Sequence, residues 1–139
     1  MRILKYTFDI PQLIVDDGEL FEKGSIKETH TFTLLFKGIN LYEKLAGKPL
    51  LNELSKYGNA NQEIDIEMIK NLACASWCKI ENDSFHQNMV TAEEFKKTEA
   101  FNLIGKDTEF MTKLLEMVMD CCLSENQKAT MKGAVNPKK

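Results

Sequence analysis

The segment 28–58 reads ETHTFTLLFKGINLYEKLAGKPLLNELSKYG, and its hydrophobic period changes at Gly38. Before that glycine, apolar and polar residues alternate over 30–36, with threonines on the polar side, which is the pattern of a half-buried β-strand. After it, apolar residues recur every three or four positions, which is the period of a helix. The segment therefore predicts a strand, a short helix from residue 39 and, beyond a Gly-Lys-Pro corner, a second short helix.

Glycine and proline mark the corner between the two predicted helices. Gly47 follows the last apolar residues of the first helix, where the left-handed backbone of a helix stop favours glycine. Pro49 suits the first turn of the next helix, because the amide hydrogen that proline lacks has no partner there. Three leucines then recur at helical spacing, and we expect Gly58 to end the second helix.

The first ten residues also alternate between apolar and polar side chains. Pro11 ends this strand, residues 13–15 offer a way to extend it, and turn signals follow at 16–18 and 24–25. We expect the strand 2–10 to pair antiparallel with 29–37, because a loop of this length lets the chain return. A ribbon of two strands is only marginally stable in water, so its apolar face must pack on helices. The residues of that face in the first strand are Leu4, Tyr6, Phe8 and Ile10.

A third helix is predicted after the Gly-Asn-Ala-Asn loop at 58–61. Asp65 is a good N-cap residue, because its side chain can accept hydrogen bonds from the first free backbone amides. An apolar stripe at helical spacing follows it, from Ile66 to Ile80. We therefore expect one helix over 65–80.

Two further helices complete the predicted fold. Thr91 and Glu94 match a capping box, in which each side chain bonds the backbone amide of the other, so a fourth helix starts there and ends at Gly105. Asp107 is a natural N-cap for a fifth helix that runs to about residue 123 and is apolar around most of its circumference. The last residues, 125–139, are polar and form a tail.

These elements predict an α+β fold, mostly helical with about five helices and with an amino-terminal antiparallel two-stranded β ribbon. We expect one domain over 1–139, with the ribbon at about 2–37 and the helical part at about 39–124. Apolar residues make up 43% of the 139 residues. That content can build a core, since a chain of this length buries roughly 68% of the surface that it exposes when unfolded.

Charge and hydropathy narrow the class of partner. A net charge of −3 argues against general binding to the phosphate backbone of nucleic acids. No run of about 18 apolar residues is present, and the first residues, MRILKYTFDI, contain neither a long apolar core nor a small-residue cleavage site. We therefore expect a cytosolic protein that binds neither nucleic acid nor a membrane.

Four cysteines raise the alternatives of a metal site or of thiol chemistry. Cys74 and Cys78 share a helix face, whereas Cys121 and Cys122 are adjacent, so their side chains diverge. The Cys-x-x-Cys spacing typical of zinc and redox sites is missing, and buried thiols explain the four residues more simply. A zinc module or a cysteine-dependent enzyme remains an alternative hypothesis. Metal analysis with thiol titration would separate it from a protein whose cysteines are only buried thiols.

Motifs for cofactor binding and catalysis are also missing. The chain contains no Gly-x-Gly-x-x-Gly and no Gly-Lys-Ser/Thr phosphate loop. His30 and His86 have no nucleophile close to them in the sequence. We predict a protein without catalytic residues, cofactor or metal.

Aromatic and methionine side chains are abundant on the short helices. The simplest interpretation is core packing, because most such residues are buried. The alternative is an exposed apolar groove for a helical partner, a role that suits methionine because its thioether adapts to varied surfaces. The predicted partner-binding residues are Tyr42, Phe85, Met89, Phe95, Phe101 and Phe110.

Five segments occur in an order that resembles a family of phage proteins. They are the threonine-phenylalanine strand 31–36, Leu41-Tyr42-Glu43-Lys44, Gly47-Lys48-Pro49-Leu50-Leu51, the helix 64–77 and the helix start Thr91-Ala92-Glu93-Glu94-Phe95. In this order, over roughly 28–120, they resemble the tail assembly chaperones of siphophages that infect Gram-positive bacteria, and most closely the lactococcal type.

The resemblance implies a non-enzymatic role in the cytoplasm of a host bacterium. Members of this family stay out of the virion, bind the long helical tape measure protein and keep it soluble while the tail tube assembles around it. They also self-associate, so the implied partners are the phage tape measure protein and further copies of this chain. The alternative is a structural protein of the phage particle, such as a head–tail connector.

Overall fold

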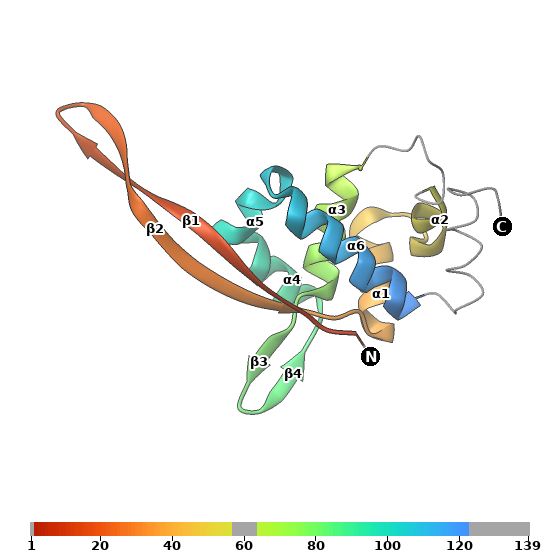
Figure 1. The fold of residues 1–139 in the computed structure, drawn as a ribbon. Helices are drawn as coiled ribbons and strands as arrows, with labels where there is room; N and C mark the ends of the chain where they lie inside the picture. Colours follow the sequence, from red (N-terminus) through yellow and green to blue (C-terminus); the bar gives the residue numbers. More distant parts are fainter. Residues whose placement is uncertain (1, 57–63, 123–139) are drawn as a thin grey trace.

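The computed structural model describes residues 2–56 and 64–122. Within these residues it contains six α-helices and two antiparallel two-stranded sheets. The longer sheet is a twisted ribbon that projects from the helical body (Figure 1), and the predicted α+β fold with an amino-terminal ribbon is confirmed. No helix in the described part is long and apolar enough to cross a membrane. The predicted tail at 125–139 and the predicted helix end at Gly58 lie outside the described residues.

The ribbon is one long hairpin, and its strands differ from those predicted. β1 spans Leu4–Asp16 and β2 spans Glu19–Phe32. β1 continues through Pro11, and β2 ends at Phe32 instead of near residue 37. The strands join at the two-residue turn 17–18, where φ is 57° and 78°. Positive φ at both turn residues gives a hairpin turn whose twist matches that of the strands, so the pairing continues to the turn.

A β-bulge replaces the turn predicted at Gly24. Pro11 pairs with Ser25 but Leu13 pairs with Glu22, so β2 carries one extra residue at this point. Gly24 has φ 79°, a conformation that a residue without a Cβ atom adopts at low cost. The bulge therefore shifts the alternation of β2 by one residue between its base and its outer part.

Six α-helices and the 3-10 turn η2 form the body in the described part of the chain. α3 lies at its centre and packs against α1, α4 and α6, while β1 packs against α5 and α6 (Figure 1). The bounds are α1 Phe36–Ala46, α2 Leu50–Ser55, α3 Ile66–Ser76, α4 Met89–Lys96, α5 Glu99–Leu103, η2 Ile104–Lys106 and α6 Thr108–Cys122.

An aromatic cluster joins the base of the ribbon to the helices. Phe8 and Phe32 both contact Phe110 of α6, with ring centroids 4.9 Å and 5.2 Å apart. All three side chains are at most 1% exposed. Full burial of one such side chain is worth about 1.5–3 kcal/mol. This contact explains how a ribbon that is marginal on its own is held to the body.

One predicted helix stop and one predicted helix start are confirmed. Gly47 ends α1 with φ 71°, and its amide donates to Glu43 O at 2.9 Å. Asp65 caps α3, because its Oδ1 accepts from Glu67 N at 3.0 Å and from Met68 N at 3.3 Å. At both positions a single local residue determines the backbone, which is why the sequence predicts them.

α3 ends earlier than predicted because the chain after it pairs with the ribbon. Thr33 N donates to Ser76 O, and Cys78 N donates to Thr31 O, both at 2.9 Å. These two bonds turn the backbone away from the helix direction immediately after Ser76. The prediction of one continuous helix over 65–80 is therefore wrong beyond residue 76.

A second hairpin follows α3 and was not predicted. β3 spans Lys79–Glu81 and β4 spans Ser84–His86. The turn between them has positive φ at Asn82 and Asp83, 52° and 61°, again the geometry of a tight hairpin. Ile80 belongs to this hairpin and is 66% exposed, so it is not part of an inward helix face.

The predicted capping box is displaced by three residues. Asn88 is the N-cap of α4: its Oδ1 accepts from Thr91 N at 3.0 Å, and Thr91 Oγ1 accepts from Asn88 N at 2.8 Å. Thr91 is thus the third helical residue, and Glu94 has no part in the box. The predicted fourth helix is also divided, because Thr98 caps a new helix by accepting from Phe101 N at 3.3 Å.

Candidate functional site

Three of the six predicted binding residues lie in the core. Tyr42, Phe95 and Phe110 are each at most 1% exposed. Phe95 stacks on Trp77, with ring centroids 5.5 Å apart and an angle of 27° between the ring planes. Side chains buried in this way hold the ribbon and the helices together. The expectation that they line an exposed groove is therefore contradicted.

The other three predicted residues lie at separate places. Phe101 is half-buried against Phe95, with ring centroids 5.9 Å apart. Phe85 on β4 is half-buried and lines a pocket beside the ribbon. Met89, at the start of α4, is 43% exposed and lines a different hollow. The six residues do not meet in one groove, although Phe85 and Met89 each contribute to a separate apolar surface.

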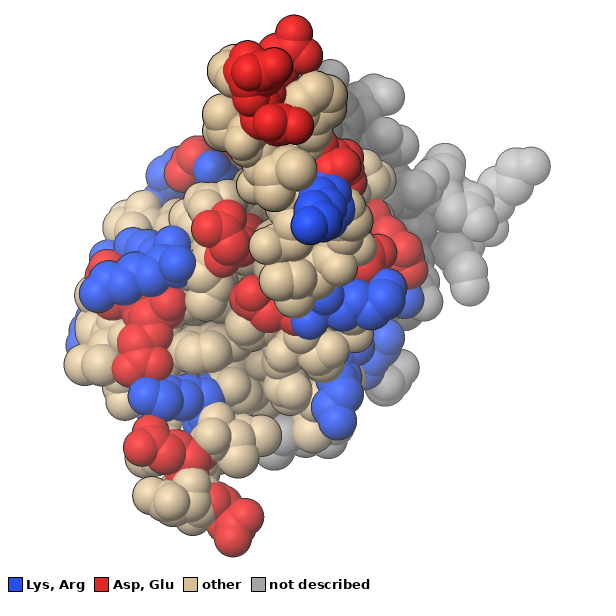
Figure 2. Space-filling view, turned by 90° about the vertical axis from the view of Figure 1, so that its left-hand side faces the viewer, with Lys and Arg blue, Asp and Glu red and all other residues tan. Residues whose placement is uncertain are grey.

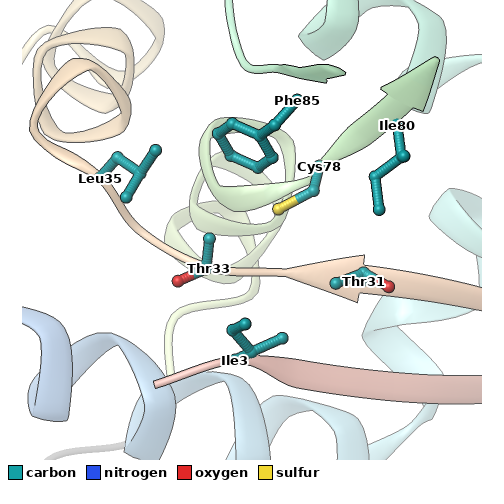
Figure 3. A pocket seen from close by; sticks show the side chains of 7 residues that line it. All are labelled: Ile3, Thr31, Thr33, Leu35, Cys78, Ile80 and Phe85. Carbon is teal, nitrogen blue, oxygen red and sulfur yellow. The ribbon is translucent and has the colours of Figure 1, made fainter. Parts of the chain in front are cut away.

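An apolar pocket lies between the base of the ribbon and the second hairpin. It has a volume of about 200 Å³ and opens to the surface. Phe85, Cys78 and Ile80 lie across it from the ribbon residues (Figure 3). We call it the base pocket, and its lining residues are Ile3, Thr31, Thr33, Leu35, Cys78, Ile80 and Phe85.

Strand alternation builds both walls of the base pocket. Phe32 points into the core, so its neighbours Thr31 and Thr33 point to the opposite side of the ribbon, where the pocket lies. Ile80 and Phe85 are directly paired across β3 and β4, so their side chains share one face. The second hairpin therefore supplies the outer wall, which the predicted helix over 65–80 would not have formed.

The base pocket is suited to one large apolar side chain. A cavity of about 150 Å³ is enough to bind benzene, so a pocket of about 200 Å³ accommodates a phenyl ring or a leucine side chain. Its titratable residue, Cys78, stays neutral near pH 7, because burial raises the pKa of this thiol to about 11. Ile3 and Ile80, 57% and 66% exposed, extend the apolar surface beyond the mouth.

The outer part of the ribbon exposes apolar side chains on both of its faces. We call residues 13–22 the arm. Val15 pairs with Leu20, and these side chains are 72% and 64% exposed; Ile14 pairs with Phe21, and these are 43% and 47% exposed. Paired residues share a face and successive residues alternate, so the two pairs lie on opposite faces. None of the described helices covers the arm, which extends away from the body (Figure 1).

The arm is also acidic. It contains four carboxylate side chains and no lysine or arginine. Figure 2 shows acidic side chains gathered at its end, at the top of that view. The sequence indicates turns at 16–18 and 24–25 and allows residues 13–15 to extend the first strand, but it does not predict the whole hairpin, although apolar residues at 13–15 and 20–21 flank the Asp-Asp-Gly turn. The acidic residues are Asp16, Asp17, Glu19 and Glu22.

A hollow of opposite charge lies between α1 and the start of α4. It has a volume of about 480 Å³. Lys37 and Lys44 are exposed on one side of α1, and neither forms an ion pair with another residue in the described ranges. Met89 and Val90, 43% and 67% exposed, add apolar surface. We call this the basic hollow, and its other lining residues are Asn40, Leu41, Gln87 and Asn88.

The cysteine, histidine and acidic side chains are the possible metal ligands of this chain. Among residues 2–56 and 64–122, no group of three or more His, Cys, Asp or Glu side chains is placed to hold a metal ion. The four cysteines are free thiols. Burial raises the pKa of Cys74 and of Cys122 to about 12, which keeps both thiols in the neutral, weakly reactive form near pH 7.

The base pocket, the arm and the basic hollow are the candidate binding surfaces among the described residues. Each presents apolar side chains to solvent, and the last two carry opposite charges. No protein-family model, curated protein or solved structure matches this chain.

Proposed function

We propose that this protein is a phage tail assembly chaperone, which binds apolar helical segments of the tape measure protein and keeps them soluble in the cytoplasm of the host bacterium. The base pocket is the observation that supports this proposal most directly. It is an apolar pocket at the surface, with Ile3 and Ile80 exposed at its mouth. A helix binds such a site by inserting one anchoring side chain and resting its neighbours on the rim.

Each copy would bind its partner weakly, and many copies would act together. One anchoring side chain contributes about 1.5–3 kcal/mol, whereas micromolar affinity needs about 8 kcal/mol. A long helical partner with repeated apolar faces can hold many copies, and the raised effective concentration then strengthens the whole complex. The net charge of −3 on each copy helps to keep such an assembly in solution.

Co-expression with a tape measure fragment from the same phage tests the proposal. We expect the fragment to stay in the soluble fraction and to co-purify only when this protein is present. Ile80→Asp should weaken co-purification, because it places a charge at the mouth of an apolar pocket. Leu51→Asp is the matched control, since Leu51 is 52% exposed and lies on α2, away from the pocket.

Two outcomes would count against this reading. If the fragment stays insoluble and nothing co-purifies with the wild-type protein, the chaperone proposal fails. If Ile80→Asp and Phe85→Ala both bind the fragment as the wild type does, the partner binds at another surface. Phe95→Ala is unsuitable for this test, because Phe95 is fully buried and its loss would destabilise the fold.

The projecting arm favours a second candidate function, that of a structural or head–tail connector protein of the phage particle. A ribbon with two apolar faces and unpaired outer edges is suited to permanent contacts between neighbouring subunits. Mass spectrometry of purified virions separates the two functions. Detection of this protein at a fixed stoichiometry in the virion would support the structural role and count against the chaperone.

A further inference from the structure

We infer that the acidic arm of one copy of this protein docks in the basic hollow of a second copy. The inference rests on the charge and apolar character of these two surfaces and is independent of the proposed chaperone function. The arm carries four carboxylates around a turn, and the hollow carries two lysines that have no ionic partner among the described residues.

The arm has the properties of a segment that is covered in an assembly. Its four paired apolar side chains are between 43% and 72% exposed, on two opposite faces. A two-stranded ribbon that exposes apolar residues on both faces is marginal in water unless something packs on it. The four carboxylates at the end of the arm keep it hydrated while it is unbound, so the arm stays extended into solvent.

The basic hollow combines positive charge and apolar surface, which complement the carboxylates and apolar side chains of the arm. Lys37 and Lys44 are two helical turns apart on α1, which places them about 10 Å from each other. Met89 and Val90 form the apolar part of the same hollow. A docked turn would place Val15 and Leu20 on these two residues, and its carboxylates beside the lysines.

The arm cannot reach the hollow of its own chain. Figure 1 shows the arm projecting from one side of the body, while α1 lies on the other side. The contact must therefore join two different copies through two different surfaces. Two copies that exchange arms reciprocally form a closed dimer, whereas a one-way contact leaves one free arm and one free hollow and continues into a ring or a filament.

An arm-to-arm contact is disfavoured by the same charges. Two arms side by side would bring their acidic ends together, and like charges at close range cost energy that no basic residue of the arm offsets. The hollow, whose two lysines have no ionic partner within residues 2–56 and 64–122, is the complementary surface. Specificity for the arm-to-hollow contact thus comes from attraction in one arrangement and repulsion in the other.

Charge exchange tests the contact. Asp16→Lys with Glu19→Lys reverses the charge of this cross-strand pair and takes the arm from a net charge of −4 to zero, whereas Lys37→Glu with Lys44→Glu takes the two charges of the hollow from +2 to −2. We expect the wild type to self-associate in sedimentation velocity experiments, and each double variant to weaken association about tenfold or more. The quadruple variant, and an equimolar mixture of the two double variants, should associate again, because the exchanged side chains of the arm then face exchanged side chains of the hollow with the opposite charge.

Two control variants separate the effect of charge at the arm and the hollow from the effect of net charge on self-association. Glu99→Lys with Glu116→Lys, and Lys5→Glu with Lys106→Glu, change the charge by the same amounts at exposed positions outside both surfaces. These controls should associate as the wild type does. All exchanged residues are exposed, so thermal unfolding should confirm that every variant is folded.

Several outcomes would overturn the inference. A wild type that stays monomeric at the highest concentration reached has no such contact. Unchanged association in either double variant places the interface elsewhere, and so does failure of the charge exchange to restore it. If arm reversal leaves self-association intact but abolishes binding of the tape measure fragment, the arm serves that partner instead. If only the chaperone proposal is wrong, the co-expression test with Ile80→Asp fails while the charge exchange still changes self-association as expected.

Discussion

Tyr6 on β1 donates its hydroxyl hydrogen to the carboxylate of Asp107, with distances of 2.8 Å to Oδ2 and 2.9 Å to Oδ1. The same Oδ1 accepts the amide hydrogen of Phe110 at 2.9 Å, so Asp107 also caps α6. One carboxylate thus fixes the start of the last described helix and holds the first strand against it.

Removing either partner of this pair should destabilise the protein. Tyr6→Phe removes one hydrogen bond to a charged group and is expected to cost about 1–2 kcal/mol of unfolding free energy. Asp107→Ala should cost more, about 2–3 kcal/mol, because it also removes the helix cap. Urea unfolding of both single variants and the double variant measures the coupling. A loss below about 0.3 kcal/mol for Tyr6→Phe would show that the bond contributes little.

Alkaline pH should weaken the fold through the same tyrosine. Burial raises the pKa of Tyr6 well above its usual value near 10, and the hydrogen bond and charge of Asp107 raise this pKa further. Below about pH 10 both folded and unfolded chains keep the phenol proton, so the contribution is complete. As the pH rises beyond that, the unfolded chain loses the proton first and the unfolding free energy falls. Urea unfolding at about pH 9 and about pH 11 should show a smaller fall for Tyr6→Phe than for the wild type.

Gly38 should not tolerate a side chain, although it lies in a helix. A Cβ atom there would lie 2.5 Å from Gln87 Oε1, 2.8 Å from Leu34 Cδ1 and 3.1 Å from Ala75 O. Gly38→Ala is expected to lower the unfolding free energy by about 1–3 kcal/mol, despite the higher helix propensity of alanine.

Gly105→Ala provides the control for this substitution. Its Cβ atom would lie 3.3 Å from Ile66 Cγ2, and Ile66 is 42% exposed and can move. The change in unfolding free energy should stay below about 0.5 kcal/mol. Equal losses in both variants would mean that the close packing between α1 and Gln87 does not limit Gly38.

The turn of the second hairpin should be improved by glycine. Asp83 has φ 61°, a left-handed conformation that glycine adopts without steric cost. Asp83→Gly creates an Asn-Gly pair, the preferred sequence for a turn with two positive φ angles. We expect a gain of about 0.5–1 kcal/mol in thermal or urea unfolding. Asn82→Val, which forces a branched side chain into the same region, should have the opposite effect.

The cysteine thiols should differ in reactivity between the folded and unfolded states. Burial raises the pKa of Cys78 to about 11 and the pKa of Cys74 and Cys122 to about 12. At pH 8 only about one thousandth of Cys78 is then thiolate, the form that reacts. Iodoacetamide labelling followed by mass spectrometry should be slow at these three positions and should accelerate with pH. Fast labelling of Cys78 at pH 8 in the folded protein, equal to that in urea, would contradict this expectation.

Sequence patterns predicted the elements whose signals are local. The inward face of β1 follows from alternation through Tyr6 and Phe8, because only one face of the strand base is covered by helices. Gly47 and Asp65 determine their helix ends through their own backbone preference and side chain. In these places the residue and its nearest neighbours contain all the information that is needed.

The sequence did not predict elements that depend on distant residues. Cys78 leaves the helical path because its amide bonds Thr31, more than forty positions earlier, and no local window contains both residues. The apolar residues up to Ile80 fit a helix period equally well, so the predicted third helix includes Lys79 and Ile80, which begin the second hairpin. Because the second hairpin supplies the outer wall of the base pocket, the pocket could not be predicted either.

The candidate site was missed for a related reason. Alternation identifies a strand with one buried face, whereas the arm is apolar on both faces and its partner strand shifts by one residue at Gly24. Phe95 and Met89 belong to similar residue classes, yet one is fully buried and the other is 43% exposed. Composition alone cannot separate core residues from surface residues when helices are this short.

The contact between Phe8 and Phe110 has a consequence for synthesis on the ribosome. The ribbon closes through neighbouring residues and can form as soon as β2 has emerged. Its inner face, however, is covered by α5 and α6, which are the last described elements to be translated. During most of translation the apolar inner face of the ribbon is therefore uncovered, and the core closes only after α6 has emerged from the ribosome.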